Sequence, residues 1–349
     1  MRGALLAAVS LTALASAGPA HAVTLNLLIW EAYIDGGILT DFTAKTGIEV
    51  HQTYYDSGDA RDEILSNPDS NVDLVVTSEN GAKLYGNRGV LSPLDPAAVP
   101  SAADYPESWT RRCGGFGLPY LWGTMGILYR SDKVTQTPAS WSDLMLPEAY
   151  LRGHIAMYDD HAEAFVAPLA LLGKSINAND NETLKQAYEV MKAQSPYVLT
   201  YSYIITSIQS PEHGQDIYMA LGYSGDQHVL NEKVGAQGLW RYVVPKEGTL
   251  SWLDCIAVNE RSKNREAALK LFDFITNAEN AARNAQSLAM PTASSAALAL
   301  IPEDMRSNPE IYTAPDILAR SQFQEELTVQ SVQARRRILS SLAQFSDAR

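Results

Sequence analysis

Residues 247–258 contain a tryptophan and a carboxylate two positions apart, Trp252 and Asp254, and then become apolar. Side chains alternate along an extended strand, so residues two apart project from the same face. An indole ring attracts a cation through its quadrupole, and a carboxylate attracts one through its charge. The pair therefore suits an organic ammonium ion that leaves bulk water, while a core tryptophan beside a hydrogen-bonded aspartate is the structural alternative.

Two further acids, Asp160 and Glu163, stand three residues apart just after an apolar segment. This spacing is typical of a helix start, where an aspartate caps free backbone amides and a glutamate follows three residues later. The end of a strand is also where side chains overhang a ligand cleft, so capping and cation binding both stay open. Tyr223 and Asp226 offer an aromatic ring and an acid at the end of another predicted strand.

The chain lacks the common catalytic and nucleotide-binding signatures, including the zinc-protease, phosphate-loop and dinucleotide motifs and the nucleophile elbow. His154 and His161 lie near the acids, but two histidines seven residues apart are weak evidence for a metal site. Tyr201 and Tyr203 are compatible with metal capture and equally with the wall of a cleft. We expect no enzyme activity, no metal and no cofactor, and we keep a metal binder or exported enzyme as the distant alternative.

Residues 1–22 have the features of a secretory signal peptide. Arg2 precedes an apolar run over residues 4–15, and Ala20-His21-Ala22 is a small-x-small cleavage sequence. We expect cleavage after Ala22 and a periplasmic location, since no later apolar run is long enough to cross a bilayer. The remaining length exceeds what one core usually supports, which predicts two domains.

The formal net charge of −13 argues against nucleic acid or an anionic membrane as the partner, and it is compatible with a cationic ligand. The two cysteines, Cys113 and Cys255, are too few for a disulfide scaffold and lack the spacing of metal ligands. An oxidising compartment permits them to pair, but pairing depends on a geometry that the sequence leaves open.

Strand and helix patterns alternate at the start of the exported chain. Residues 24–30, 48–55 and 72–76 are predicted strands with helices between them. This order implies a parallel sheet with right-handed crossovers, in which ligands lie beyond the carboxyl ends of the strands. Those ends contain Trp30, Tyr55 and Ser78.

Two predicted strands cross between the first α/β region and a second one. Residues 124–129 lead into a region with strands at 154–157 and 217–223, and residues 252–258 return. Two late amphipathic helices follow, and we expect the arginine run 335–337 on the last one to form a solvated face.

From Leu25 to its last helix the chain resembles the periplasmic spermidine/putrescine-binding proteins of ABC importers. The matching stretches are residues 30–33, 42–48, 73–78, 119–123, 159–163, 252–254 and 291–292. The resemblance implies an α/β, two-lobed periplasmic binding protein (type II-like), each lobe a mostly parallel sheet flanked by helices, joined by crossing strands. We expect residues 23–127 with 258–315 to form the first lobe, and residues 128–257 with 316–349 the second.

The resemblance places a polyamine between the lobes, where aromatic rings sandwich its methylenes and acids pair with its amines. The residues that it implies for ligand binding are Trp30, Tyr33, Ser78, Asp160, Glu163, Tyr223, Trp252, Asp254 and Gln324. We add Glu31 and Asp226 as further acids. Ala32, Asn80 and Met290 depart from the family, since an acid and two tyrosines are usual there, which leaves the length of the ligand open.

The expected ligand is a spermidine, putrescine or norspermidine type of polyamine, captured for the membrane permease of an ABC importer. The chain also looks like a subgroup in which a norspermidine-type binding protein signals through a membrane-bound cyclic-di-GMP enzyme. Delivery and sensing use the same ligand-bound form, so the binding residues leave both roles open. We expect a monomer and no nucleic-acid partner.

Overall fold

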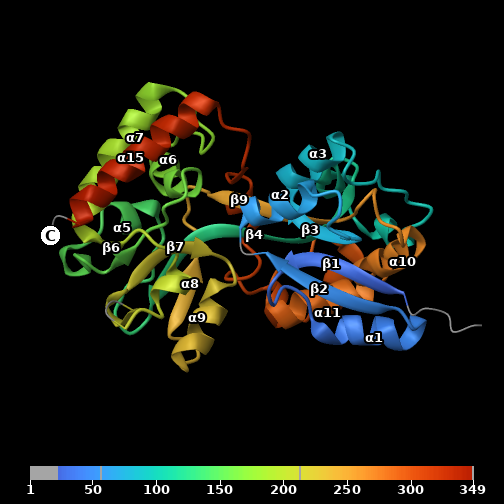
Figure 1. The fold of residues 1–349 in the computed structure, drawn as a ribbon. Helices are drawn as coiled ribbons and strands as arrows, with labels where there is room; N and C mark the ends of the chain where they lie inside the picture. The colour runs from blue at the N-terminus through green and yellow to red at the C-terminus, as the bar shows by residue number, and fades with distance from the viewer. Residues whose placement is uncertain (1–22, 56, 212–213, 348–349) are drawn as a thin grey trace, which may run out of the picture.

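The computed structural model describes residues 23–55, 57–211 and 214–347, which form two α/β lobes around one continuous sheet (Figure 1). The predicted signal peptide and its cleavage site lie outside these residues. The strand order is β2-β1-β3-β9-β4-β7-β5-β6, with β10 paired to β9 and β8 paired to β4. The strands are β1 (Thr24–Trp30), β2 (Glu49–Tyr55), β3 (Leu74–Ser78), β4 (Gly117–Arg130), β5 (Ile155–Ala156), β6 (Val198–Thr200), β7 (Met219–Tyr223), β8 (Trp240–Val243), β9 (Leu250–Val258) and β10 (Gln322–Phe323).

The first lobe is built on β1, which lies between β2 and β3 and runs parallel to both. Four residues of β1, Leu25, Leu27, Leu28 and Ile29, are fully buried, as expected for a strand covered on both faces. One core joins the sheet to α1 (Gly36–Thr46), α10 (Arg265–Thr276) and α11 (Ala278–Leu288). Another joins its opposite face to α2 (Gly58–Ser66) and α3 (Glu79–Asn87), which lie above the sheet in Figure 1.

The second lobe surrounds β7, which lies between β4 and β5. Strand β5 runs parallel to β6 and to β7. Its main core includes α5 (Trp141–Met145), α6 (Val166–Leu171), α7 (Asn181–Gln194) and α15 (Val329–Asp347), and a smaller core includes α8 (Ile204–Ser207) and α9 (Asp226–Val234). The remaining α-helices of the described residues are α4 (Glu107–Thr110), α12 (Ser295–Leu300), α13 (Glu303–Arg306) and α14 (Pro315–Leu318).

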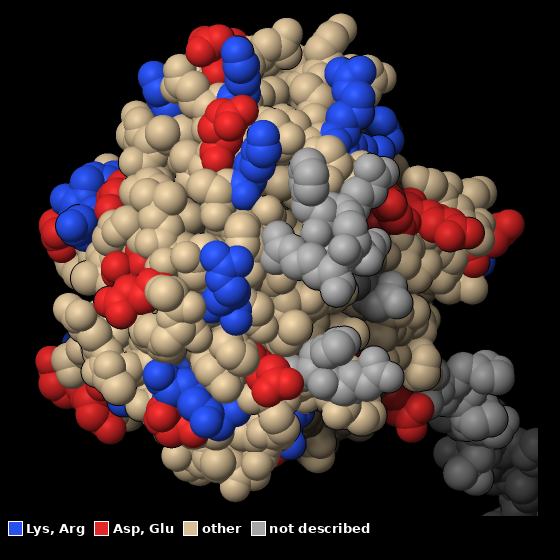
Figure 2. All heavy atoms as spheres, turned by 90° about the vertical axis from the view of Figure 1, so that its left-hand side faces the viewer, with Lys and Arg blue, Asp and Glu red and all other residues tan. Residues whose placement is uncertain are grey.

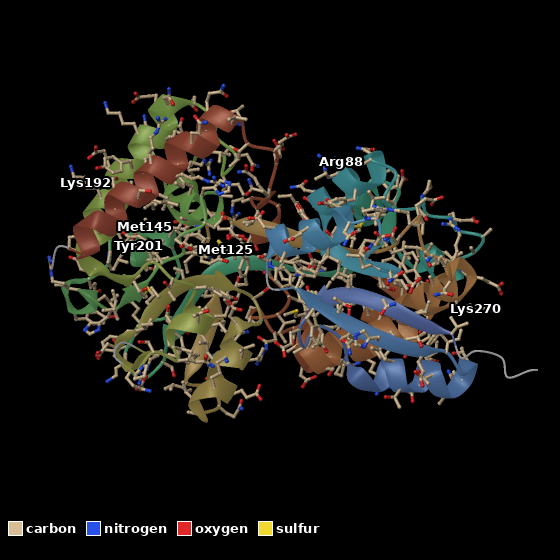
Figure 3. All side chains as sticks on the ribbon, viewed as in Figure 1. Arg88, Met125, Met145, Lys192, Tyr201 and Lys270 are labelled. Carbon is tan, nitrogen blue, oxygen red and sulfur yellow. A yellow bond between two sulfur atoms is a disulfide. The ribbon has the colours of Figure 1, made fainter. Side chains whose placement is uncertain are left out.

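Strands β4 and β9 join the lobes. The first half of β4, up to Thr124, pairs with β9, and its second half, from Met125, pairs with β7 and β8. Met125 accordingly lies at the junction of the two lobes in Figure 3. Leu250 of β9 packs in the second core and Leu253 in the first. Both strands thus contribute to both lobes, and the predicted lobe boundaries stay a prediction.

A third connection brings the chain back to the second lobe through β10. Asn177, in the loop before α7, holds this segment by two hydrogen bonds. Its Nδ2 donates to the carbonyl of Phe323 (2.9 Å), and its Oδ1 accepts from the amide of Glu325 (2.9 Å). Helix α15 then packs beside α7, as Figure 1 shows.

The prediction of a solvated arginine run is wrong for Arg335. Arg336 and Arg337 are exposed, whereas Arg335 is fully buried and donates through Nη2 to the carbonyls of Ile176 (3.0 Å) and Ala178 (2.9 Å). Consecutive residues of an α-helix point about 100° apart, so three in a row cannot share one face. Burial lowers the pKa of Arg335 to about 10.

The outer surface of the second lobe carries charges of both signs. On the face shown in Figure 2, basic and acidic side chains are scattered among uncharged ones rather than collected into a basic patch. No helix in the described ranges is long and apolar enough to cross a membrane.

Cys113 and Cys255 form a disulfide with a Cα–Cα distance of 5.9 Å, which answers the question that the sequence left open. The bond ties the 3-10 helix Arg111–Cys113 to β9, directly beside Asp254.

Replacing both cysteines by alanine should lower the free energy of unfolding by roughly 3–5 kcal/mol, because the disulfide closes a long loop in the unfolded chain. The sequence separation of the pair is 142 residues. Urea unfolding without reductant measures the effect, and reduced wild type serves as the comparison. Equal midpoints for the oxidised wild type and the variant would contradict the expectation.

Candidate functional site

Aromatic side chains gather at the carboxyl ends of β1 and β2. Trp30 and Tyr55 end these strands in register, and their ring centroids lie 4.4 Å apart. Tyr33, in the turn after β1, is buried with its ring 5.6 Å from that of Tyr120. The Tyr120 hydroxyl donates to the carbonyl of Tyr33 (2.7 Å), which fixes the turn. These rings form a wall at the edge where parallel sheets bind ligands.

Asp254 lies against this wall on β9, in register with Ser78 of β3. Its neighbours in the strand confirm the predicted alternation, because Trp252 and Asp254 are half-buried while Ser251, Leu253 and Cys255 are buried. Burial raises the pKa of Asp254 to about 6, although a hydrogen bond with Tyr33 and the charge of Arg61 act in the opposite direction.

The second lobe contributes a matching group of tyrosines and acids. The Tyr223 hydroxyl, at the end of β7, donates to Oε1 of Glu163. The Tyr203 hydroxyl donates to Oδ1 of Asp226 (2.7 Å), and the backbone amide of Tyr223 donates to Oδ2 (2.8 Å). Both oxygens of the buried Asp226 therefore have partners within the protein, and this acid holds the turn between β7 and α9.

A line of rings runs from the second-lobe group to the crossing strand. Centroid distances are 5.3 Å from Tyr158 to Tyr203, 6.2 Å from Tyr203 to Tyr223 and 6.5 Å from Tyr223 to Trp252. Trp252 belongs to the crossing strand β9, so the line runs from the second lobe to the junction. We call the whole set the acid–aromatic cluster: Trp30, Tyr33, Tyr55, Tyr158, Glu163, Tyr203, Tyr223, Asp226, Trp252 and Asp254.

The sequence left both helix capping and cation binding open for Asp160 and Glu163, and the structure gives the two acids different partners. Oδ1 of Asp160 accepts from the amides of Ala162 (2.6 Å) and Glu163 (3.1 Å), so Asp160 caps the turn. The Glu163 side chain instead reaches Tyr223. Burial raises the pKa of Glu163 to about 8, the charge of Asp160 adds to the rise, and the Tyr223 bond opposes it. A carboxyl held neutral near pH 7 is ready to ionise when a cation arrives.

Three predicted ligand residues are outside the hydrogen bonds and ring contacts of the cluster, although Ser78 pairs in register with Asp254. Glu31 is exposed in the turn after β1. Ser78 caps α3 by accepting from the amide of Gly81 (3.2 Å), and the carbonyl of Gln324 accepts from Asn80 Nδ2 (3.2 Å) in the same helix. The structure thus brings Gln324 to the N-terminal turn of α3, near Ser78, but leaves Glu31 at the surface. Their ligand roles stay predictions.

The sequence analysis assigned no ligand role to Tyr55, Tyr158 and Arg61. For Tyr203 it left open whether the residue captures a metal or lines the wall of a cleft. Tyr55 ends a predicted strand, and that position is the one signal that pointed to it. Arg61 lies one helical turn before Leu65 on α2, and both are buried. That spacing places the arginine on the inner face of the helix, a signal that could have been recognised.

The described residues contain no group of three or more histidines, cysteines, aspartates or glutamates that could hold a metal ion. A cavity of about 240 Å³ lies elsewhere, against Lys174 and Gly248, and has none of the predicted ligand residues in its lining. The acid–aromatic cluster itself offers carboxyls and tyrosine hydroxyls beside a row of rings.

Residues 37–313 match the family of bacterial extracellular solute-binding proteins. The chain belongs to this family. It is 30% identical over 331 residues to the norspermidine sensor of Vibrio cholerae, covering 95% of this chain and 91% of that one. It is 28% identical over 310 residues to the spermidine/putrescine-binding periplasmic protein of Salmonella typhimurium, covering 87% of each.

A crystal structure from Streptococcus pneumoniae, the spermidine/putrescine ABC transporter substrate-binding protein PotD, shares the fold. Its TM-score is 0.83 at 23% identity, over 93% of this chain and 100% of that one. The resemblance and the two-lobed α/β fold inferred from the sequence are confirmed.

The pKa of Glu163 makes the stability of this solute-binding protein depend on pH. A carboxyl whose pKa is raised on folding favours the folded state below its unfolded pKa of about 4.5, and this contribution is lost as the pH rises through about 8. Without ligand, wild type should lose roughly 2 kcal/mol more than Glu163→Gln between about pH 6.5 and 9. That window lies above the pKa values of about 6 for Asp226 and Asp254.

Urea unfolding at the two pH values measures this difference. Glu189→Gln, at an exposed position of α7, is the matched control and should behave as wild type. Identical pH dependence in wild type and Glu163→Gln would show that Glu163 ionises normally in the folded protein.

Proposed function

We propose that this protein captures a linear polyamine between its lobes and delivers it to the membrane permease of an ABC importer. The observation that carries the proposal is the acid–aromatic cluster, in which the half-buried Glu163 and Asp254 and the buried Asp226 lie among rings from the second lobe to the crossing strand. Relatives named for spermidine, putrescine and norspermidine support the same class of ligand.

Each part of the cluster has a counterpart in a polyamine. Moving an ammonium out of water costs several kcal/mol unless a carboxylate pairs with it, and Glu163 and Asp254 are acids in the right setting. Asp160 adds negative charge beside Glu163. The faces of Tyr223 and Trp252 suit the methylenes and also attract the ammonium groups. No proton, electron or group transfer is needed, and we infer a binding protein rather than an enzyme.

Ligand capture should also draw the lobes together. A ligand shifts a conformational equilibrium only through contacts that differ between the states. Glu163 belongs to the second lobe, whereas Asp254 packs on the wall of the first, so a chain with an amine for each bridges them. Residues 1–22 fit this role as an export signal cleaved after Ala22.

A sensory role is the second candidate. The relative that matches 95% of this chain is the norspermidine sensor of Vibrio cholerae. In that role the ligand-bound protein would signal to a membrane-bound cyclic-di-GMP enzyme instead of a permease. Deleting the gene separates the two: an importer subunit is required for uptake of labelled polyamine, whereas a sensor subunit is required for the response of cyclic-di-GMP to added polyamine.

Calorimetry with putrescine, norspermidine and spermidine tests the ligand class. Asp254→Asn should weaken binding by about tenfold or more, on the order of 1.4 kcal/mol, because one buried ammonium loses its counterion. Asp69→Asn, at an exposed position of the first lobe, removes the same charge and should leave affinity unchanged. If the wild-type protein binds none of the three amines, the proposed function is contradicted.

Binding should also release protons. An ammonium beside Glu163 stabilises the ionised carboxyl, so its pKa falls from about 8 and the proton leaves. Calorimetry at about pH 7 in buffers of different ionisation enthalpy counts the protons, and Glu163→Gln should release fewer than wild type. Equal counts would place the ammonium away from Glu163.

A further inference from the structure

The third connection between the lobes is held from both sides. It contains residues 322–325, which we call the return segment. The first two of these residues form β10, which pairs with the crossing strand β9 and places Phe323 in register with Ser251, one residue before Trp252. The first lobe holds the side chain of Phe323, whereas the second lobe holds the backbone around it.

The Phe323 ring lies under an arginine of the first lobe. The Cζ atom of Arg112 is 3.3 Å from the ring centroid, well inside the range of a cation–π contact. Trp109 adds an edge contact, with a centroid distance of 6.3 Å and an interplanar angle of 80°. The ring also packs against the first core. Phe323 is therefore anchored to the first lobe.

Arg112 is itself fixed by two neighbours in the first lobe. Its Nη1 donates to Oε2 of Glu79 (3.4 Å), an acid whose side chain is only 7% exposed. The next residue along the chain, Cys113, is joined to Cys255 of β9 by the disulfide. An ion pair with a buried acid and a covalent link one residue away thus hold the guanidinium over Phe323.

The second lobe holds the backbone on either side of Gln324. The buried Asn177 donates through Nδ2 to the carbonyl of Phe323 (2.9 Å) and accepts through Oδ1 from the amide of Glu325 (2.9 Å). Asn177 is held in turn by Arg335, whose Nη2 donates to the carbonyls of the residues before and after it (3.0 and 2.9 Å). The return segment therefore links a fixed group of the first lobe to a fixed group of the second.

We propose that Arg112 is a positioning residue for ligand binding. Through Phe323 it keeps the two lobes in the relative position that brings Glu163 and Asp254 into one acid–aromatic cluster. This inference rests on the proposed function. A ligand binds only the molecules in the competent arrangement, so the apparent affinity falls with their fraction when a contact between the lobes is lost.

Calorimetry of Arg112→Met with spermidine, norspermidine and putrescine tests this role. The affinity should fall roughly tenfold, because the variant lacks a cation–π contact that is largely shielded from water. Arg111→Met is the matched control, since Arg111 is the preceding residue and its side chain is 73% exposed. It should bind the amines as wild type does. A folded Arg112→Met protein with wild-type affinity overturns the proposal.

Phe323→Leu removes the other partner of the contact and leaves no buried charge without a partner, so it serves even if Arg112→Met fails to fold. It should lose affinity to a similar extent. The double variant should lose no more than either single variant, since both changes delete the same contact. Wild-type affinity in Phe323→Leu, or losses that add up in the double variant, overturns the proposal.

The relative position of the lobes can be measured without ligand by the distance between two spin labels. Arg88→Cys and Lys192→Cys provide exposed label sites on the outer surfaces of the two lobes, as Figure 3 shows. Arg112→Met and Phe323→Leu should broaden the distance distribution, whereas Arg111→Met should not. A distribution as narrow as that of wild type in both variants overturns the role of Arg112. A wild-type protein that binds no amine overturns the polyamine function instead.

Discussion

The site depends on one electrostatic constraint: a carboxyl group removed from water needs a proton, hydrogen-bond donors or a positive partner. Glu163, Asp226 and Asp254 all have raised pKa values because the fold buries them. The two carboxylate oxygens of Asp226 accept hydrogen bonds from the Tyr203 hydroxyl and the Tyr223 amide. Glu163 keeps a proton instead, and Asp254 has a hydrogen bond with Tyr33. An exported chain that maintains such groups has a use for a cation that comes from outside.

Strands β4 and β9 position these groups at the junction of the two lobes. Side chains of both strands pack in the cores of both lobes, and Trp252 and Asp254 occupy alternate positions of β9 just where it enters the first core. The disulfide links Cys255, the next residue of β9, to Cys113. Asp254 is thus held on the backbone of a crossing strand, while Glu163 belongs to the second lobe. A ligand that joins them joins the lobes.

Local patterns in the sequence were enough for the parts of the fold that depend on neighbours in the chain. Period-two alternation placed Trp252 and Asp254 on one face, and the spacing of Asp160 and Glu163 signalled a capped turn. The partnership of Glu163 with Tyr223 joins residues 60 positions apart, and no local pattern encodes it. The prediction for Arg335 was wrong because its charge suggested solvent exposure, whereas its buried guanidinium donates to three backbone carbonyls.

The arginines Arg61 and Arg335 show why charge alone is a poor guide to such a site. The charge of Arg335 acts on Asp160, and that of Arg61 acts on Asp254, so each lobe carries one internal cation near an acid. Both arginines are buried. A count of charged residues in the sequence therefore does not give the charge that a ligand would meet, because part of the positive charge lies inside each lobe.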